Sequence, residues 1–575
     1  MSRSRFACAT IGVVMVCAVA AGQTTLVSIN STGVPGNDNS ETLAISSAGR
    51  FVAFTSLATN LVAGDTNGFQ DIFVRDRQSA TTVRVSVDSA GVQGNAASWK
   101  PSISSDGVFV AFESQATNLI AADANGSVQD IYVRDRTSAT TALVSKSTTG
   151  VQGNGLSFYC SISADGRSVA FNSVSTNLVA NDTNGWTDVF VRDRTSGTTE
   201  RVSVATSGTQ GDLSSGNPSI SADGRFVAFE SQATTLVTGD TNALIDIFVR
   251  DRAAGTTVRA SVHTSGAQSN ADCAYDSISA DGRFVAYQSL ATNLINGDTN
   301  GVLDIFVRDL VSATTERVSL DSAGAEGNAN SYAPSVSSGG RCVAFYSLAS
   351  NLVAGDTNGF HDTFVHDRVS GLTDRVSIGA AGLQGNYHSY TASISSDARY
   401  VAFMSQASNF PGDTNNFRDI FMRDRGPQTP TSYCTAGTTS HACTAQISGN
   451  ALPSLSLANA CDIAVSGVEG LKSGILFYGV DNTGYTPGVW APGSTSLLCV
   501  KHPTQRTPIQ NSGGTFGACD GAFVLDWNAY QTANPLALGN PWSVGARVYA
   551  QAWFRDPLAV KSTNLSNALE MTYVP

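Results

Sequence analysis

The sequence predicts an all-β protein: a seven-bladed β-propeller closed by its N-terminal strand and followed by a small C-terminal β-sandwich. The first observation is a period, because the segment Asp71–Arg77 (DIFVRDR) recurs in close copies at steps of 59, 58, 58, 58, 58 and 57 residues. The second is that each period holds four short strand patterns, which is the content of a propeller blade. The third is an offset, since the last repeat lacks its fourth strand and a spare strand precedes the first. The copies begin at Asp71, Asp130, Asp188, Asp246, Asp304, Asp362 and Asp419.

One repeat, residues 215–263, illustrates the four strands. Residues 215–221 are predicted to form a short strand, and Asp223-Gly224 then supplies a tight turn because this pair tolerates positive φ. Residues 226–230 are apolar on both faces, as expected for a strand buried between neighbouring sheets. A long segment leads to a third strand at residues 246–250, and a second turn leads to a fourth strand at residues 256–262.

The two ends of the repeat region predict how the ring closes. After the last third strand, at residues 419–422, the Pro-rich segment at residues 426–430 intervenes and no fourth strand follows. The N-terminal strand at residues 24–30 can therefore pair with that third strand and leave no open edge between blades. A linear solenoid would not need this offset. Copies of the fourth strand begin near Thr24, Thr81, Thr140, Thr198, Thr256, Thr314 and Leu372.

Three motifs of the repeat resemble a known family. Ser-x-Asp-Gly-Arg-x-Val-Ala-Phe, Asp-Ile-Phe-Val-Arg-Asp and a strand ending Arg-Val-Ser are similar to the WD40-like propeller repeat of TolB-type proteins, over about residues 24–425. The resemblance implies a propeller and says little about function, because one fold hosts many functions. This chain departs from the family in a longer segment between the second and third strands. Ala48 and Gly339 also replace the turn Asp in two repeats.

The long connections are expected on one face of the ring. Strands within a blade are antiparallel, so successive connections alternate between the two faces. The first-to-second and third-to-fourth connections are tight and share one face, whereas the second-to-third and fourth-to-first connections are long and share the other. Loops on a rigid scaffold commonly carry function, so the long-loop face is where we expect binding.

The long loop before each third strand repeats the pattern Asp-x-Asn followed by a later Asp. Oxygen ligands at such spacing are offered to Ca²⁺ in extracellular proteins, although the loop lacks the bidentate Glu of an EF-hand. The alternative is structural, with Asp and Asn forming Asx-turns that close the loop onto the strand. The possible ligands are Asp65, Asn67, Asp71, Asp123, Asn125, Asp130, Asp182, Asn184, Asp188, Asp240, Asn242, Asp246, Asp298, Asn300, Asp304, Asp356, Asn358, Asp362, Asp413, Asn415 and Asp419.

Aromatic residues near the first strand of several repeats differ from blade to blade. Asymmetry of this kind is what a specific binding site needs, and these positions are expected near the mouth of the central channel. Aromatic side chains there suit stacking on a glycan or a peptide; the alternative is that they pack between blades. The candidates are Trp99, Tyr159, Tyr275, Tyr332 and Tyr390.

No catalytic residue is identified from the sequence. The six histidines occupy unrelated positions in the chain, and neither a His-x-x-x-His pair nor a Gly-x-Ser-x-Gly elbow occurs. Most acidic residues belong to the repeat and have structural explanations. We therefore expect a binding protein rather than an enzyme, with a carboxylate pair for glycoside cleavage as the alternative.

Charge and the N-terminus bear on partners and location. The net charge is −12 and no basic cluster is present, which argues against nucleic acid as a partner. Residues 1–22 are typical of a signal peptide, with Arg3 and Arg5 before an apolar run and small residues near Ala20. No other segment is long and apolar enough to span a bilayer. We expect a secreted or periplasmic monomer after cleavage.

The period disappears after the linker at residues 426–433. Residues 434–575 contain alternating apolar runs and polar turns, which predict a β-sandwich. Five cysteines lie there, a density that favours disulfides in an oxidising compartment. The local candidates are Cys434 with Cys443 and Cys499 with Cys519, although sequence alone does not establish the pairing. Residues 511–515, 553–557 and 564–570 resemble an uncharacterised module of large secreted bacterial proteins, which implies attachment or display.

Three hypotheses follow from these observations. The first is a secreted, non-enzymatic propeller that binds a protein or glycan through its long-loop face. The second is a secreted glycosidase or lyase with its site at the channel mouth. The third is a TolB-like component of a periplasmic envelope complex, which the lack of an α/β domain between the signal and the first strand disfavours. Unrepeated acids at the channel mouth would favour an enzyme, and uniform residues would favour a scaffold.

Overall fold

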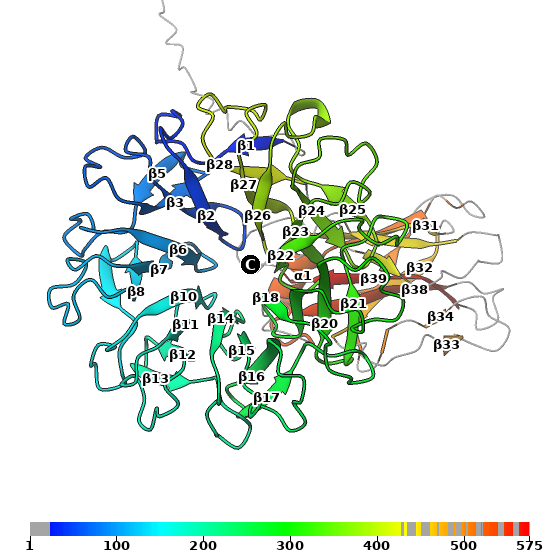
Figure 1. Cartoon of the computed structure of the whole chain (residues 1–575). Helices are drawn as coiled ribbons and strands as arrows, with labels where there is room; N and C mark the ends of the chain where they lie inside the picture. The colour runs from blue at the N-terminus through cyan, green and yellow to red at the C-terminus, as the bar shows by residue number, and fades with distance from the viewer. Residues whose placement is uncertain are drawn as a thin grey trace, which may run out of the picture.

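The structure, a computed structural model of the chain, contains the predicted propeller. It describes residues 23–426, 431–433, 444–449, 461–468, 471–480, 488–489, 497–498, 500–501, 504–512, 519, 521–538, 546–555 and 563–573. The predicted signal peptide therefore lies outside the described residues. Seven four-stranded antiparallel sheets are arranged around a central axis (Figure 1).

Each sheet is a blade, and in six of the seven blades the strands follow chain order from the channel outward. Blade 1 contains β2 (Ser40–Ile45), β3 (Phe51–Ser56), β4 (Asp71–Asp76) and β5 (Thr81–Arg84). Blade 2 contains β6 (Ser98–Ile103), β7 (Phe109–Ser114), β8 (Asp130–Asp135) and β9 (Thr140–Leu143), and blade 3 contains β10 (Ser157–Ile162), β11 (Ser168–Ser173), β12 (Asp188–Asp193) and β13 (Thr198–Arg201). Blade 4 contains β14 (Ser215–Ile220), β15 (Phe226–Ser231), β16 (Asp246–Asp251) and β17 (Thr256–Arg259).

The remaining three blades complete the ring. Blade 5 contains β18 (Cys273–Ile278), β19 (Phe284–Ser289), β20 (Asp304–Asp309) and β21 (Thr314–Arg317). Blade 6 contains β22 (Ser331–Val336), β23 (Cys342–Ser347), β24 (Asp362–Asp367) and β25 (Thr373–Arg375), and a 3₁₀ turn, η1 (Ala380–Gly382), follows it. Blade 7 contains β26 (Ser389–Ile394), β27 (Tyr400–Ser405) and β28 (Asp419–Asp424), and its fourth strand is β1 (Thr24–Leu26).

The predicted closure is confirmed. Strand β1 pairs antiparallel with β28, with Thr24 opposite Arg423 and Leu26 opposite Phe421. The regular strand is shorter than the predicted 24–30, but Val27 N continues the ladder to Ile420 O at 2.7 Å. The first and last parts of the propeller thus share one sheet, and the ring has no unpaired inter-blade edge.

The hydrophobic core lies between neighbouring blades. Between blades 1 and 2, for example, Ile72 and Val74 of β4 pack with Val110 and Phe112 of β7, all fully buried. The second strand is therefore covered on both faces, as its apolar sequence predicts. Because each core layer needs two blades, the stability of one blade depends on its neighbours.

The turn glycines are required by close approach of the preceding blade. Gly107 has φ +73°, and a Cβ atom there would lie 2.1 Å from the ring of Phe51 in blade 1. The guanidinium of Arg136 lies 4.7 Å from the centroid of the same ring, and its Nη1 donates to Gly107 O at 2.5 Å. The Asp-Gly turn and the second arginine of the DIFVRDR segment thus act together to join adjacent blades.

The C-terminal unit consists of small β-sheets with one short helix. Strand β29 (Thr431–Tyr433) pairs with β39, so this unit includes residues of the segment predicted as a linker. Trp527 and Tyr478 are the largest side chains of its core, and α1 begins after Asp526, whose side chain accepts from Ala529 N. The other elements are β30 (Gln446–Gly449), β31 (Asp462–Val468), β32 (Ser473–Gly479), β33 (Gly488–Val489), β34 (Leu497–Leu498), β35 (Gln505–Arg506), β36 (Gln510–Asn511), β37 (Gly521–Asp526), α1 (Trp527–Ala533), β38 (Arg547–Arg555) and β39 (Thr563–Thr572).

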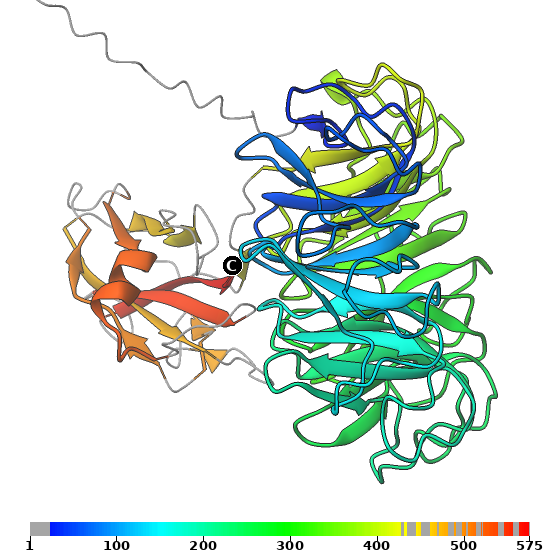
Figure 2. The same ribbon diagram turned by 90° about the vertical axis from the view of Figure 1, so that its left-hand side faces the viewer.

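The C-terminal unit contacts one face of the propeller. Figure 2 shows it to one side of the ring of blades. Arg547 of β38 donates to the carbonyl of Gly339, which lies in the tight turn between β22 and β23. The contact is therefore on the tight-turn face, opposite the predicted long-loop face. Of the helices in the described parts of the chain, none has the length and apolar character needed to cross a membrane.

Candidate functional site at the channel mouth

A β-bulge in the innermost strand places one residue of each blade at the central channel. In six blades the third residue of this strand has positive φ, from 35° to 55°, although none is glycine. The ladder to the next strand shifts register at the same place, for instance between Trp99 and Ser102. Non-glycine residues adopt positive φ only when their surroundings enforce it. The six residues are Lys100, Tyr159, Asn217, Tyr275, Ala333 and Thr391.

These bulge residues, with Thr42 of blade 1, line a cavity of about 250 Å³. The innermost strand begins at the long-loop face, so its third residue lies toward that end of the channel. Tyr159 and Tyr275 are 40% and 55% exposed. The ammonium group of Lys100 lies 5.0 Å from the ring centroid of Tyr159. The mouth therefore presents two accessible aromatic rings and one cation, while the other bulge positions carry small or neutral side chains.

Two buried glutamates hold the bulges. Glu113 of β7 accepts from Tyr159 N at 2.6 Å, and Glu230 of β15 accepts from Tyr275 N at 2.5 Å. Burial raises the pKa of Glu113 to about 7, although the Tyr159 N–H and the Lys100 charge act in the opposite direction. Burial also raises the pKa of Glu230, against the effect of its bonds from Tyr275 and Asn217.

Asp276 is the only charged residue at the fourth position of the innermost strands, which directly follows the bulge residue in the channel wall. The corresponding positions of the other blades carry Leu43, Pro101, Cys160, Pro218, Pro334 and Ala392. Both carboxylate oxygens of Asp276 are buried and have no hydrogen-bond partner among the described residues. Burial, together with the charge of Glu230, raises the pKa of Asp276 well above its usual range. The channel wall therefore holds a buried acid, Asp276, close to a second carboxyl group, Glu230.

The predicted aromatic residues fall into separate groups. Tyr159 and Tyr275 line the cavity, whereas Tyr332 and Tyr390 belong to a cluster at blades 6 and 7. In that cluster Tyr346 stacks on Tyr332 at 5.1 Å and contacts Tyr390 edge-on at 5.7 Å. Tyr346 is also close enough to Tyr275 that the ionised Tyr275 would raise its pKa. Trp99 lies opposite Glu113 in the ladder and does not line the cavity.

Two histidines extend this aromatic cluster. The Nδ1 atoms of His361 and His388 are 3.0 Å apart, and the His361 ring lies 5.1 Å from that of Tyr390. Burial and the neighbouring His388 lower the pKa of His361 to about 4. His361 is therefore neutral at neutral pH, and the cluster presents uncharged rings.

The acidic residues of the channel mouth, Glu113, Glu230 and Asp276, were not among the predicted site residues. The signal was present, however, because the fifth residue of the second strand varies more than its neighbours. It reads Thr55, Glu113, Asn172, Glu230, Gln288, Tyr346 and Met404 in the seven blades. This position became interpretable only once the bulge showed that its side chain faces the bulge of the next blade. The mouth thus has the unrepeated acids that the enzyme hypothesis requires.

The Asp-x-Asn loops are internal ion-pair networks in most blades. In blade 1, Arg84 Nη1 lies 3.0 Å from Asp65 and 3.1 Å from Asp71, and Asn67 donates to Asp71 at 3.0 Å. Ser86 donates to the same carboxylate at 2.5 Å. The residues predicted as ligands do converge, but an arginine occupies the place between the carboxylates. No group of three or more metal-binding side chains is found among the described residues.

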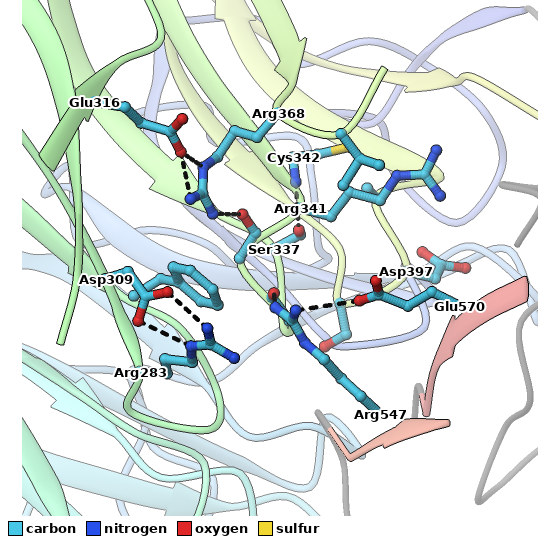
Figure 3. Close-up of a pocket in the computed structure, with 16 residues that line it drawn as sticks. Arg283, Asp309, Glu316, Ser337, Arg341, Cys342, Arg368, Asp397, Arg547 and Glu570 are labelled. Carbon is cyan, nitrogen blue, oxygen red and sulfur yellow. Dashed lines mark hydrogen bonds and ion pairs between the residues drawn. The ribbon is translucent and has the colours of Figure 1, made fainter. Parts of the chain in front are cut away.

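A second cavity, of about 290 Å³, lies where the C-terminal unit meets blades 5 and 6 (Figure 3). Arg547 Nη2 donates to Gly339 O at 2.8 Å, and Arg547 Nη1 pairs with Glu570 at 3.1 Å. Its guanidinium also lies 5.2 Å from the ring centroid of Phe284. The other arginines of this cavity pair with carboxylates too: Arg283 with Asp309, Arg368 with Glu316 and Arg341 with Asp367. We interpret this cavity as a docking surface between the two units.

The disulfide candidates are only partly described. Cys519 is disulfide-bonded, whereas Cys434, Cys443 and Cys499 lie outside the described residues. Its predicted pairing with Cys499 therefore stays a prediction. In the propeller, Cys273 and Cys342 are buried thiols.

No protein-family model and no curated protein matches the chain. Solved structures show a distant similarity to TolB-like and peptidase propellers. TolB from Acinetobacter baumannii is 16% identical with a TM-score of 0.32, over 60% of this chain and 64%, less than two thirds, of that one. An oligogalacturonate lyase in complex with manganese is 11% identical with a TM-score of 0.41, over 71% of this chain and 98% of the other. An acylaminoacyl peptidase from Pyrococcus horikoshii is 11% identical with a TM-score of 0.40, over 76% and 59%.

Proposed function

We propose that this protein is an exported glycan-binding propeller whose ligand enters the channel mouth from the long-loop face. The observation that carries the proposal is the pairing, in one cavity, of two accessible tyrosines with the carboxyl group of Asp276. Aromatic rings stack on the apolar faces of sugars, and carboxyl groups bond to their hydroxyls. A mouth lined by such groups suits a neutral or weakly cationic saccharide better than a polyanion.

The position of the C-terminal unit supports this choice of face. Its contacts with the propeller, through Arg547, lie at the tight turns of blades 5 and 6. The long-loop face is thereby left to the ligand, at least with respect to the described residues. The unit itself would serve attachment or display, and export would follow from the predicted signal at residues 1–22.

A second candidate, a glycoside-cleaving enzyme, is favoured by one specific observation. Asp276 lies near Glu230, and burial together with the charge of Glu230 raises the pKa of Asp276 well above its usual range. Two carboxyl groups of unlike protonation are what a general acid and its partner need. In this reading Asp276 would donate the proton to the leaving oxygen, and Glu230 would act as the base or nucleophile.

The test is a binding survey with defined oligosaccharides on the full mature chain, followed by calorimetry on the best ligand. We expect Tyr275→Ala to weaken binding by about tenfold or more, because a stacking contact contributes roughly 1–2 kcal/mol. The matched control is Trp186→Ala, which removes an aromatic ring 46% exposed on a long loop away from the cavity. Equal affinity of the two variants would refute the channel-mouth site.

The same ligand distinguishes binding from cleavage. The release of new sugar ends, abolished by Asp276→Asn while affinity is retained, would establish the enzyme. Unchanged ligand after prolonged incubation, with normal binding, would support the binding protein.

A further inference from the structure

The seven Asp-x-Asn loops are alike in backbone but differ in what neutralises their two carboxylates. In five blades the last residue of the fourth strand is an arginine whose Nη1 bridges both carboxylates at 3.0–3.2 Å. One cationic nitrogen thus sits between two acids. These arginines are Arg84, Arg201, Arg259, Arg317 and Arg375.

Blade 2 has replaced this arginine and compensates with a neutral donor. Leu143 occupies the arginine position, and Gln152 moves into the gap. Its Nε2 donates to Asp123 at 3.0 Å, to Asn125 at 2.9 Å and to Asp130 at 2.7 Å. The centre of the loop is filled by protein atoms here as well.

Blade 7 has neither the bridging arginine of five blades nor the glutamine of blade 2. Its fourth strand is β1, and Leu26 stands opposite Phe421 where five of the other blades have arginine. The position of Gln152 is taken by Pro35, which has no side-chain donor. Asp419 is fully buried, and its Oδ1 accepts from Ser28 Oγ at 2.5 Å. Its Oδ2 and the Oδ2 of Asp413 are both buried without a hydrogen-bond partner among the described residues.

We propose that blade 7 binds one divalent cation of the Ca²⁺ class between Asp413 and Asp419, in the place that an arginine nitrogen occupies in five other blades. Two orphan carboxylate oxygens in a low-dielectric site leave an uncompensated charge, which a hard cation neutralises through oxygen ligands. Water and backbone carbonyls would complete the coordination. Since β1 is the strand that closes the ring, the cation would stabilise the joint between the two ends of the propeller.

The proposal is tested by titrating Ca²⁺ into the full mature chain after treatment with a chelator. We expect calorimetry to give about one site per chain rather than seven, and Ca²⁺ to raise the melting temperature. Asp413→Asn should weaken binding by about tenfold or more, because it removes one charged ligand. The matched control is Asp356→Asn in blade 6, whose carboxylate pairs with Arg375 at 3.2 Å, and it should leave Ca²⁺ binding unchanged.

A reciprocal variant tests the substitution of arginine for metal. Leu26→Arg introduces the side chain that five of the other blades have at this position, and it should abolish the Ca²⁺ response while raising stability in chelator. If this variant fails to fold, the Asp413 and Asp356 pair still decides the question. Absence of Ca²⁺ binding by the wild type, or binding that survives Asp413→Asn, would overturn the proposal.

Discussion

The outer loops and the channel mouth of this propeller both contain buried acidic residues, but these residues serve different purposes in the two regions. At the outer loops, buried acids recur in every blade, and in five of the seven they are matched by arginine, serine and asparagine partners. At the mouth, buried acids occur in only some blades, and Asp276 has no partner among the described residues. A feature repeated seven times serves the ring as a whole, because every inter-blade joint needs it. A feature confined to one or two blades marks a place where the molecule does something specific.

The largest expected effect is at a repeated position. Asp304→Ala should destabilise the chain by about 3–5 kcal/mol, because it removes a fully buried carboxylate that pairs with the buried Arg317 and accepts from Ser319. Urea unfolding followed by fluorescence measures the loss. Asp374→Ala, whose carboxylate is 63% exposed and pairs with Arg425 at 3.4 Å, should cost less than about 1 kcal/mol.

Glycan affinity of the folded Asp304→Ala variant should remain that of the wild type. A strong loss of affinity with little loss of stability would contradict this comparison, because a repeated position would then serve ligand binding rather than the stability of the ring.

The next effect concerns pH at the mouth. Glu113 has a pKa of about 7 in the folded chain, above the ordinary value of 4.5, so the native state holds its proton to higher pH than the unfolded state. Stability from this group is therefore present below about pH 4.5 and declines as pH rises toward 7 and beyond. Glu113→Gln should remove this decline. The unfolding free energy of the variant, relative to that of the wild type, should therefore be about 1–3 kcal/mol higher at pH 8 than at pH 5. Unfolding curves at the two pH values measure this difference. If stability depended on pH in the variant as it does in the wild type, the pH dependence could not be assigned to Glu113.

The smallest effect concerns a position where one blade departs from the repeat. Gly339 replaces the turn Asp of most other blades, and its carbonyl accepts from Arg547 at 2.8 Å. Arg547→Ala should cost less than about 1 kcal/mol in overall stability, because its ion pair with Glu570 is partly exposed. It should nevertheless speed protease cleavage between the two units. Arg506→Ala, which lines a different pocket of the C-terminal unit, serves as the control and should leave cleavage unchanged.

Much of the fold was predictable because its causes are local. The turn pair Asp223-Gly224, the apolar second strand and the offset at Thr24 each act within a few residues or through a fixed period. The candidate site was less predictable, because the bulge that turns Tyr159 into the channel comes from a register shift with no clear sequence signal. Trp99 and Tyr332 looked equivalent to Tyr159 in the sequence, yet they precede the bulge and lie elsewhere.

The sequence by itself determined the seven blades, their order and the closure by β1, since a strict period and a missing strand leave one arrangement. Only the tertiary structure decided what the acids do. Asp65 and Asp71 are near in sequence and looked like ligands, but Arg84 reaches them across the sheet and neutralises them. Glu113 looked ordinary until the next blade placed Tyr159 against it. The physical reason is that the state of a buried charge depends on partners brought from neighbouring strands and blades.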